Sequence, residues 1–157
     1  MKNWRVVLQI LVAAVGLLLT SCTRADSPRD FADRFIAAEN KAWSTGEIED
    51  LKALEDTDIV YHLPGLDLKG WKAHEDYIVK SRPTVSDLKQ NWKYLSGEGN
   101  HLVLAYDSSA VLKGNENSPS QAVSNNYLFV LSLKDQKVVE VWANGSSMSK
   151  PVEEAKK

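Results

Sequence analysis

The stretch QAVSNNYLFVLSL, residues 121–133, decides the fold, because it predicts the longest β-strand of the chain. Its even positions include Leu128 and Val130, and its odd positions include Tyr127 and Phe129. Alternate side chains of a strand point to opposite faces of a sheet, so both faces of this strand carry apolar residues. Such a strand suits the centre of a sheet that is covered on both sides.

Further strands are predicted on either side of this stretch. Residues 88–94 alternate between apolar and polar positions, which predicts a half-buried strand, and residues 101–112 and 138–144 predict two more. The turns between them are marked by GEGN at 97–100 and by KDQK at 134–137. The second half of the chain therefore predicts a run of strands joined mostly by short turns.

Helices are predicted ahead of these strands. Ser27 can cap a helix, Pro28 suits a first helical position, and Gly46 suits the left-handed residue that follows a helix. The predicted helices are residues 28–46, 47–54 and 70–82, with a strand over 58–63 between the second and the third.

This order of elements, α-α-β-α-β-β-β-β, predicts an α+β domain. Three N-terminal helices would pack on one face of the sheet. A strongly curved antiparallel sheet wrapped over helices makes a cone-shaped domain with an apolar interior. The sequence therefore predicts a cone with a pocket or a filled core inside it.

Three short motifs resemble the SnoaL-like branch of the nuclear-transport-factor-2-like superfamily. They are DIVYHLPG at 58–65, LKG at 68–70 and KVVEVW at 137–142. The resemblance spans residues 28–148 and leaves a polar tail over 149–157. It implies a fold shared by polyketide cyclases, isomerases and dehydratases, and by members that only bind or dimerise. Fold alone therefore leaves the function open.

The chain begins with a stretch typical of a secretory signal. Lys2 and Arg5 precede an apolar run over 6–20, which is shorter than the roughly 20 apolar residues that a membrane span needs. The closing Leu-Thr-Ser-Cys resembles the lipobox of bacterial lipoproteins, which implies cleavage after residue 21 and lipidation of Cys22. An ordinary signal peptide and an uncleaved anchor are the alternatives.

Lipidation of Cys22 implies a membrane-anchored protein. Residues 22–27 would then be the lipidated cysteine and a short tether. Thr23, rather than Asp, follows the cysteine, which in a Gram-negative host implies the outer membrane with the domain facing the periplasm. Two or three acyl chains would hold the protein on the bilayer, whereas one chain binds only reversibly.

Composition excludes several classes of function. Of the 19 basic residues, Lys2 and Arg5 fall in the predicted signal, whereas all 21 acidic residues lie beyond it. The mature chain is therefore mildly acidic and has no basic patch for nucleic acid. Cys22 is the only cysteine, so disulfides and thiol chemistry are excluded once it is acylated.

No metal or other cofactor is predicted. The three histidines, His62, His74 and His101, show no ligand spacing. The sequence also has no glycine-rich phosphate loop and no nucleotide-binding motif.

Two residues are candidates for catalysis. In the isomerase branch the base is an Asp directly before a proline, and here Leu63 precedes Pro64, so that base is absent. His62 lies one residue earlier and could be a base in the cone, or a half-exposed histidine bonded to neighbouring backbone. Asp107 could be a carboxylate in apolar surroundings, or a strand residue bonded to a nearby serine.

The last strand offers a further set of polar residues. In SnoaL-like cyclases an acidic residue on a late strand is the acid–base group, and here Glu140, Trp142 and Asn144 share one face. Ala143 occupies the place where many relatives carry Asp. Glu140 could serve as an acid or base, but a solvated cross-strand partner is the simpler interpretation.

The pocket is predicted to combine aromatic and amide side chains. Buried amides need hydrogen-bond partners, so one of the adjacent Asn125 and Asn126 is expected to face the cavity, and we assign Asn126. The predicted pocket-binding residues are Trp43, Tyr61, His62, Asn126, Trp142 and Asn144.

Three hypotheses for function follow. The first is a membrane-anchored domain whose cone binds a small apolar or amphipathic ligand. The second is a SnoaL-like isomerase, cyclase or dehydratase that uses acid–base chemistry in the same pocket, through His62 or Asp107. The third is a pocketless module that forms a homodimer through its sheet face.

Overall fold

The structure is a computed structural model that describes residues 27–115 and 118–152. The predicted signal and Cys22 lie outside the described residues. The described part begins with helix α2, Pro28–Thr45. Within residues 27–115 and 118–152, no helix is both long and apolar enough to cross a bilayer.

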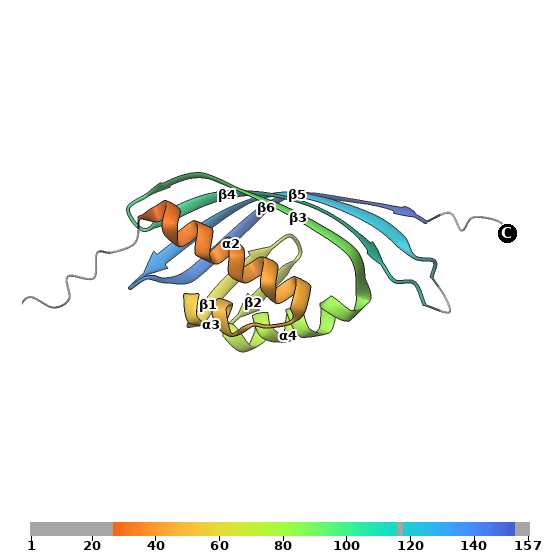
Figure 1. Ribbon diagram of the computed structural model, residues 1–157, viewed down its shortest axis with the longest axis horizontal. Helices are drawn as coiled ribbons and strands as arrows, with labels where there is room; N and C mark the ends of the chain where they lie inside the picture. The colour runs from red at the N-terminus through yellow and green to blue at the C-terminus, as the bar shows by residue number, and fades with distance from the viewer. Residues whose placement is uncertain (1–26, 116–117, 153–157) are drawn as a thin grey trace, which may run out of the picture.

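Both predicted ends of helix α2 are confirmed. The Ser27 side chain accepts a hydrogen bond from the Asp30 amide, and the Asp30 carboxylate accepts one from the Ser27 amide, which makes a capping box. Gly46 ends the helix in the left-handed region at φ 87°, where glycine carries no steric penalty. The apolar stripe that includes Phe31, Phe35 and Ala42 is buried against the sheet (Figure 1).

The segment after α2 folds into two short helices around a hairpin. Helix α3 ends at Leu54 and runs directly into strand β1, and the hairpin turns at Gly65, where φ is 78°. Helix α4 is followed by a 3-10 helix that leads into the long strands. The bounds are α3 Glu49–Leu54, β1 Glu55–Leu63, β2 Leu66–Lys69, α4 Trp71–Ser81 and the 3-10 helix Arg82–Thr84.

Four long strands complete a sheet of six in the order β2-β1-β6-β5-β4-β3. They are β3 Val85–Glu98, β4 His101–Leu112, β5 Gln121–Lys134 and β6 Lys137–Pro151. The predicted α+β fold, with N-terminal helices under a curved sheet, is confirmed, and the sheet does not close into a barrel (Figure 1). Two details were not predicted: the extra strand β2, and the parallel pairing of β1 with β6 in an otherwise antiparallel sheet.

The polar tail starts later than predicted. The last strand was expected to end near Asn144 and the tail to start at residue 149, but β6 continues to Pro151. It does so because β5 supplies a backbone partner for its whole length, out to the pair of Gln121 with Pro151. Polar side chains along this end therefore do not prevent strand pairing.

The sheet is covered on one face only among the described residues. The helices lie on its concave side (Figure 1), and the buried core includes Leu102, Leu104 and Leu131 there. On the convex side Leu128 is 42% exposed and Trp142 is 53% exposed. The expectation that both faces of residues 121–133 are covered is therefore wrong for the described part of the chain, where no helix lies over the convex face.

Candidate functional site

A cavity of about 390 Å³ lies between the concave face of the sheet and helices α2 and α4. Its size is that of a small-ligand pocket. Most of its walls are aromatic or aliphatic. The aromatic residues that line it are Trp43, Tyr61, Tyr77, Trp92, Tyr106, Tyr127 and Phe129.

Aromatic contacts hold the cavity walls together. Trp92 contacts both Tyr106 and Phe129, with ring centroids 4.3 and 5.1 Å apart. On the helical side the rings of Trp43 and Tyr77 meet edge to face at 6.0 Å. Such pairs stabilise a fixed arrangement of large side chains, so these walls can remain apart without a ligand between them.

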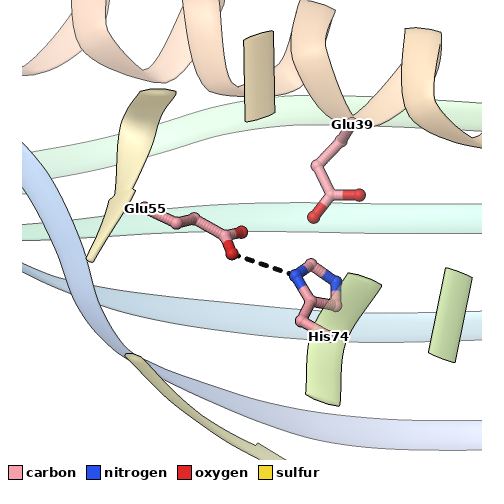
Figure 2. Close-up of side chains that lie close together, drawn as sticks. All are labelled: Glu39, Glu55 and His74. Carbon is pink, nitrogen blue, oxygen red and sulfur yellow. Dashed lines mark hydrogen bonds and ion pairs between the residues drawn. The ribbon is translucent and has the colours of Figure 1, made fainter. Parts of the chain in front are cut away.

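Two ionisable side chains, Glu39 and His74, also line this apolar cavity. Glu39 lies on α2 and His74 on α4, and each is on the buried face of its helix. Glu55, the first residue of β1, lies behind them and is 2% exposed. Figure 2 shows the three side chains converging from these three elements. We call Glu39, Glu55 and His74 the acid–base cluster.

Glu55 accepts hydrogen bonds on both of its oxygens. His74 Nδ1 lies 3.0 Å from Glu55 Oε2 (Figure 2), and the Tyr61 hydroxyl donates to Glu55 Oε1 over 2.5 Å. The first contact orients the imidazole ring and leaves its Nε2 free of Glu55. A carboxylate forms a stronger hydrogen bond with a charged imidazole than with a neutral one. Glu55 therefore also favours the charged form of His74.

The cluster shifts the pKa of two of its members in the same direction. Burial raises the pKa of Glu39 to about 7, although the charge of His74 and interactions with Trp43 and Tyr61 act against it. Burial lowers the pKa of His74, but the hydrogen bond and charge of Glu55, together with the charge of Glu39, outweigh this, so the pKa is raised overall. Near neutral pH the site therefore combines a carboxyl group close to its midpoint with an imidazole whose charged form is favoured.

This arrangement can move protons. A buried carboxyl group with a pKa near the working pH is effective as a general base, and an imidazolium beside it is a ready donor. One ligand atom from each of the three residues also lies within 4.8 Å of the others, so the same cluster could hold a metal ion. Each oxygen of Glu55 also has a hydrogen-bond partner within the protein, Tyr61 or His74.

The predicted pocket residues divide into two groups. Trp43 and Tyr61 line the cavity, and their role in binding stays a prediction. Asn126 was expected to face the cavity, but it is exposed and Asn125 lines the cavity instead. The reason is strand alternation, which sends neighbouring side chains to opposite faces. Trp142 and Asn144 are also exposed and are not among the lining residues.

Both predicted catalytic candidates lie outside the cavity. His62 stacks on Trp142, with ring centroids 3.8 Å apart, and its two ring nitrogens lie 3.1 Å from Asp67 and 3.4 Å from Glu140. Asp107 is exposed and accepts a hydrogen bond from Asn126 Nδ2 over 2.5 Å. Neither residue is among those that line the cavity. Acid–base chemistry inside it must therefore use other groups.

The acid–base cluster was not predicted, although the sequence contains a signal for it. Glu39 is four residues after Phe35 and three before Ala42, which places a carboxyl group on the apolar stripe of a helix. His74 is likewise three residues after Trp71 and four before Ile78. A polar residue at a core position needs a partner, and that need could have been recognised from the sequence.

Comparison with known proteins agrees with this architecture. An NTF2-like protein from Burkholderia xenovorans LB400 has a TM-score of 0.61 at 15% identity, over 76% of this chain and 88% of that one. An LEH-like epoxide hydrolase from M. tuberculosis has 0.58 at 12% identity, over 76% and 82%. The hexachlorocyclohexane dehydrochlorinase LinA-type3 from Novosphingobium barchaimii LL02 has 0.61 at 13% identity, over 79% and 89%.

At these identities the solved structures establish the fold alone. No curated protein sequence matches the chain. The model of the SnoaL-like domain family matches residues 32–141, which is most of the chain. These residues contain all three members of the acid–base cluster. The chain therefore belongs to the SnoaL-like domain family.

Proposed function

We propose that this protein is an enzyme that transfers protons to and from a small, largely apolar molecule in the cavity. Glu39 is the general base, His74 is the general acid, and Glu55 orients His74. The observation that carries the proposal is the position of Glu39, a carboxyl group that is 5% exposed, lines the cavity and has a pKa of about 7. A base of this pKa is half ionised at neutral pH and poorly solvated, and both properties favour proton abstraction.

The reaction class follows from the two groups. Glu39 takes a proton from a carbon of the substrate, and His74 gives a proton to the oxygen or leaving group that gains negative charge. Formation of an enol from a carbonyl compound and elimination of water both need this pair of transfers. Support comes from the names of two proteins with this fold, an LEH-like epoxide hydrolase and a hexachlorocyclohexane dehydrochlorinase. Both names describe reactions of small molecules, and a cavity of about 390 Å³ has room for a molecule of that kind.

The proposal is tested with 5-nitrobenzisoxazole, a small aromatic compound whose ring opens when a base removes its carbon-bound proton. The electrons of the C–H bond form the nitrile, the N–O bond breaks, and a coloured phenolate is released. We expect the full chain to catalyse this reaction, with a rate that rises through pH 7 as Glu39 ionises. Glu39→Gln should reduce the rate by at least about 100-fold.

Glu98→Gln is the matched control, because Glu98 is an exposed glutamate at the end of β3. It should leave the rate unchanged. A wild-type rate no greater than that of free acetate at equal concentration would contradict the enzymatic proposal. So would equal activity of the wild type and Glu39→Gln. Inactivity combined with tight binding of 5-nitrobenzisoxazole would favour the purely ligand-binding alternative.

A metal ion at the acid–base cluster is a distinct alternative that the same assay separates. We expect dialysis against EDTA to leave the ring-opening rate unchanged, because hydrogen bonds from Tyr61 and His74 already occupy Glu55. Loss of activity on dialysis, restored by Zn²⁺ or Mn²⁺, would instead assign Glu39, Glu55 and His74 as ligands.

We also propose that the protein is a lipoprotein, lipidated at Cys22 and held at the surface of a membrane. Support comes from the sequence alone: a charged start, an apolar run over 6–20 and the lipobox-like Leu-Thr-Ser-Cys. A fatty acid fed to cells that express the full chain should label it. Cys22→Ser should abolish that label, and a labelled Cys22→Ser protein would overturn the proposal.

A further inference from the structure

A row of polar side chains crosses the sheet wall of the cavity, on elements other than those of the acid–base cluster. Gln90 on β3 pairs in register with Ser108 on β4, and Ser108 pairs with Asn125 on β5. All three line the cavity, and Ser108 is only 8% exposed. We call Gln90, Ser108 and Asn125 the polar row.

The polar row is unusual for its surroundings. The next row along the same strands is aromatic, because Trp92 pairs with Tyr106 and Tyr106 with Tyr127. Side chains that pair directly across strands lie close enough to interact. Polar groups placed in an apolar wall lose solvation unless they find partners, so a structural explanation requires that they satisfy one another.

Two hydrogen bonds from the polar row are formed inside the cavity wall, one to Ser108 and one to Tyr106. Asn125 Nδ2 donates to Ser108 Oγ over 3.0 Å, and Gln90 Nε2 donates to the Tyr106 hydroxyl oxygen over 3.3 Å. Because Ser108 Oγ accepts from Asn125, its own proton is free to be donated. Burial raises the pKa of Tyr106, and hydrogen bonds from Ser108 and Gln90 act against that increase, as donors to its oxygen do.

The hydroxyl proton of Tyr106 is available to an acceptor in the cavity. A tyrosine hydroxyl can donate one hydrogen bond while its oxygen accepts others. Gln90 Nε2 can only donate, so its hydrogen bond uses the Tyr106 oxygen and leaves the Tyr106 proton unused, and a Ser108 hydroxyl that donates to Tyr106 does the same. Tyr106 lines the cavity, so an acceptor atom of a bound molecule can take this proton.

We infer that Tyr106 binds an oxygen of the substrate, that the polar row positions its hydroxyl for this, and that the substrate is a largely apolar ketone or related carbonyl compound. The aromatic walls accommodate the apolar body, and the carbonyl oxygen accepts from Tyr106. For its catalytic consequence this inference rests on the proposed function: removal of a proton beside a carbonyl group places negative charge on its oxygen. A donor already aimed at that oxygen stabilises the charge.

The two halves of the site line the same cavity, because Glu39 and Tyr106 both border it. The charge of Glu39 also contributes to the raised pKa values of both Tyr106 and Tyr77. Tyr106 touches the substrate in this scheme, whereas Gln90 and Ser108 act through Tyr106 and are positioning residues.

Two fluorescent probes that differ in one feature test the inference. In 2-acetylnaphthalene a carbonyl group can accept a hydrogen bond, whereas 2-ethylnaphthalene has a similar shape and no acceptor. We expect the full chain to bind the ketone at least tenfold more tightly than the hydrocarbon. Tyr106→Phe should remove that preference, and Tyr94→Phe, a tyrosine change on β3 outside the cavity lining, should retain it.

An infrared measurement adds a readout that altered packing would not change. The carbonyl stretch of bound 2-acetylnaphthalene should lie at a lower frequency in the wild type than in Tyr106→Phe, since a hydrogen bond weakens the C=O bond. Gln90→Leu should give a smaller displacement than the wild type, because one donor to the Tyr106 oxygen is lost. Equal affinity for the two probes, or an unchanged carbonyl frequency in Tyr106→Phe, would overturn the inference.

Its failure is separable from that of the proposed function. A ketone preference that depends on Tyr106, found without ring opening of 5-nitrobenzisoxazole, would leave the oxygen site standing and refute Glu39 as a base. Ring opening that depends on Glu39, found without a ketone preference, would support Glu39 as a base and refute the oxygen site at Tyr106.

Discussion

Glu39 is a carboxyl group placed where an apolar side chain would otherwise pack. It lies on the buried stripe of α2 and is 5% exposed. Burial of an ionised carboxylate is costly, so the folded protein favours the protonated form. Its pKa rises from 4.5 to about 7, which means that Glu39 binds a proton more tightly in the folded chain than in the unfolded one.

The sign of the resulting pH dependence follows directly. Below pH 4.5 Glu39 is protonated in both the folded and the unfolded chain, so no charge has to be buried on folding. As the pH rises to about 7, the unfolded chain loses this proton first, and the stability that proton retention provided is lost. A shift of this size corresponds to about 3 kcal/mol once both states are ionised. His74, whose pKa is also raised, adds in the same direction.

Glu39→Gln should therefore stabilise the protein at high pH. Glutamine has a similar shape and no charge to bury, so the free energy of unfolding should exceed that of the wild type by about 2–3 kcal/mol at pH 8. Near pH 4.5 the difference should be much smaller. Urea unfolding of the full chain at several pH values measures it, and a constant difference across pH 4.5–8 would contradict a raised pKa.

At the scale of elements, Arg82 connects the 3-10 helix to the end of α2. Its Nε donates to the Trp43 carbonyl oxygen over 3.1 Å, and its Nη2 donates to the Ser44 carbonyl oxygen over 2.9 Å. The last carbonyl groups of a helix have no partner within the helix, and a cation there also complements the helix dipole. Arg82 thus holds α2 and the segment after α4 together at one side of the cavity.

Replacement of Arg82 by methionine should destabilise the protein by roughly 2 kcal/mol, the scale expected for loss of charge-assisted hydrogen bonds. Lys93→Met is the control, since Lys93 is exposed on β3. Chemical unfolding of both variants measures the difference. Equal stability of Arg82→Met and the wild type would show that the two hydrogen bonds contribute no net free energy.

How far the sequence predicts these elements depends on how local their causes are. The ends of α2 were predictable because Ser27 and Gly46 act on their immediate neighbours. The parallel pairing of β1 with β6 was not, because Val60 meets Glu140 across most of the domain and neither segment's own pattern specifies that partner. The full length of β6 was not predictable either. Its last residues are polar, and they stay in the strand because their backbone pairs with β5.

The acid–base cluster depends on the same kind of distant pairing. Glu39, Glu55 and His74 come from α2, β1 and α4, and no spacing between them in the sequence suggests one site. The sequence can identify Glu39 and His74 as polar residues on apolar helix faces. That they meet each other follows only from the packing of both helices on one curved sheet (Figure 1).

At the scale of the whole molecule, the domain is packed tightly at one end and hollow at the other. At the packed end, residues such as Ala32 on α2 and Leu102 and Leu104 on β4 are fully buried. Farther along the concave face the aromatic walls leave the cavity of about 390 Å³. The sequence predicted a cone but could not distinguish an open one from a filled one, because apolar side chains line both.

The two regions should respond differently to the same increase in volume. Ala143 lines the cavity from β6, so the larger side chain of Ala143→Leu has space to occupy and should change the free energy of unfolding by less than about 1 kcal/mol. Ala32 is 0% exposed in the packed core, so Ala32→Leu must displace its neighbours and should cost roughly 2 kcal/mol or more.

Ligand binding should show the opposite order. Ala143→Leu reduces the space for a bound molecule and should weaken binding of 2-acetylnaphthalene at least tenfold. Ala32→Leu, measured at a temperature where it is folded, should bind the probe as the wild type does. Chemical unfolding and fluorescence titration of the two variants give both numbers. Equal destabilisation by the two substitutions would mean that side chains close the cavity in solution, and the proposed site would then have no room for a substrate.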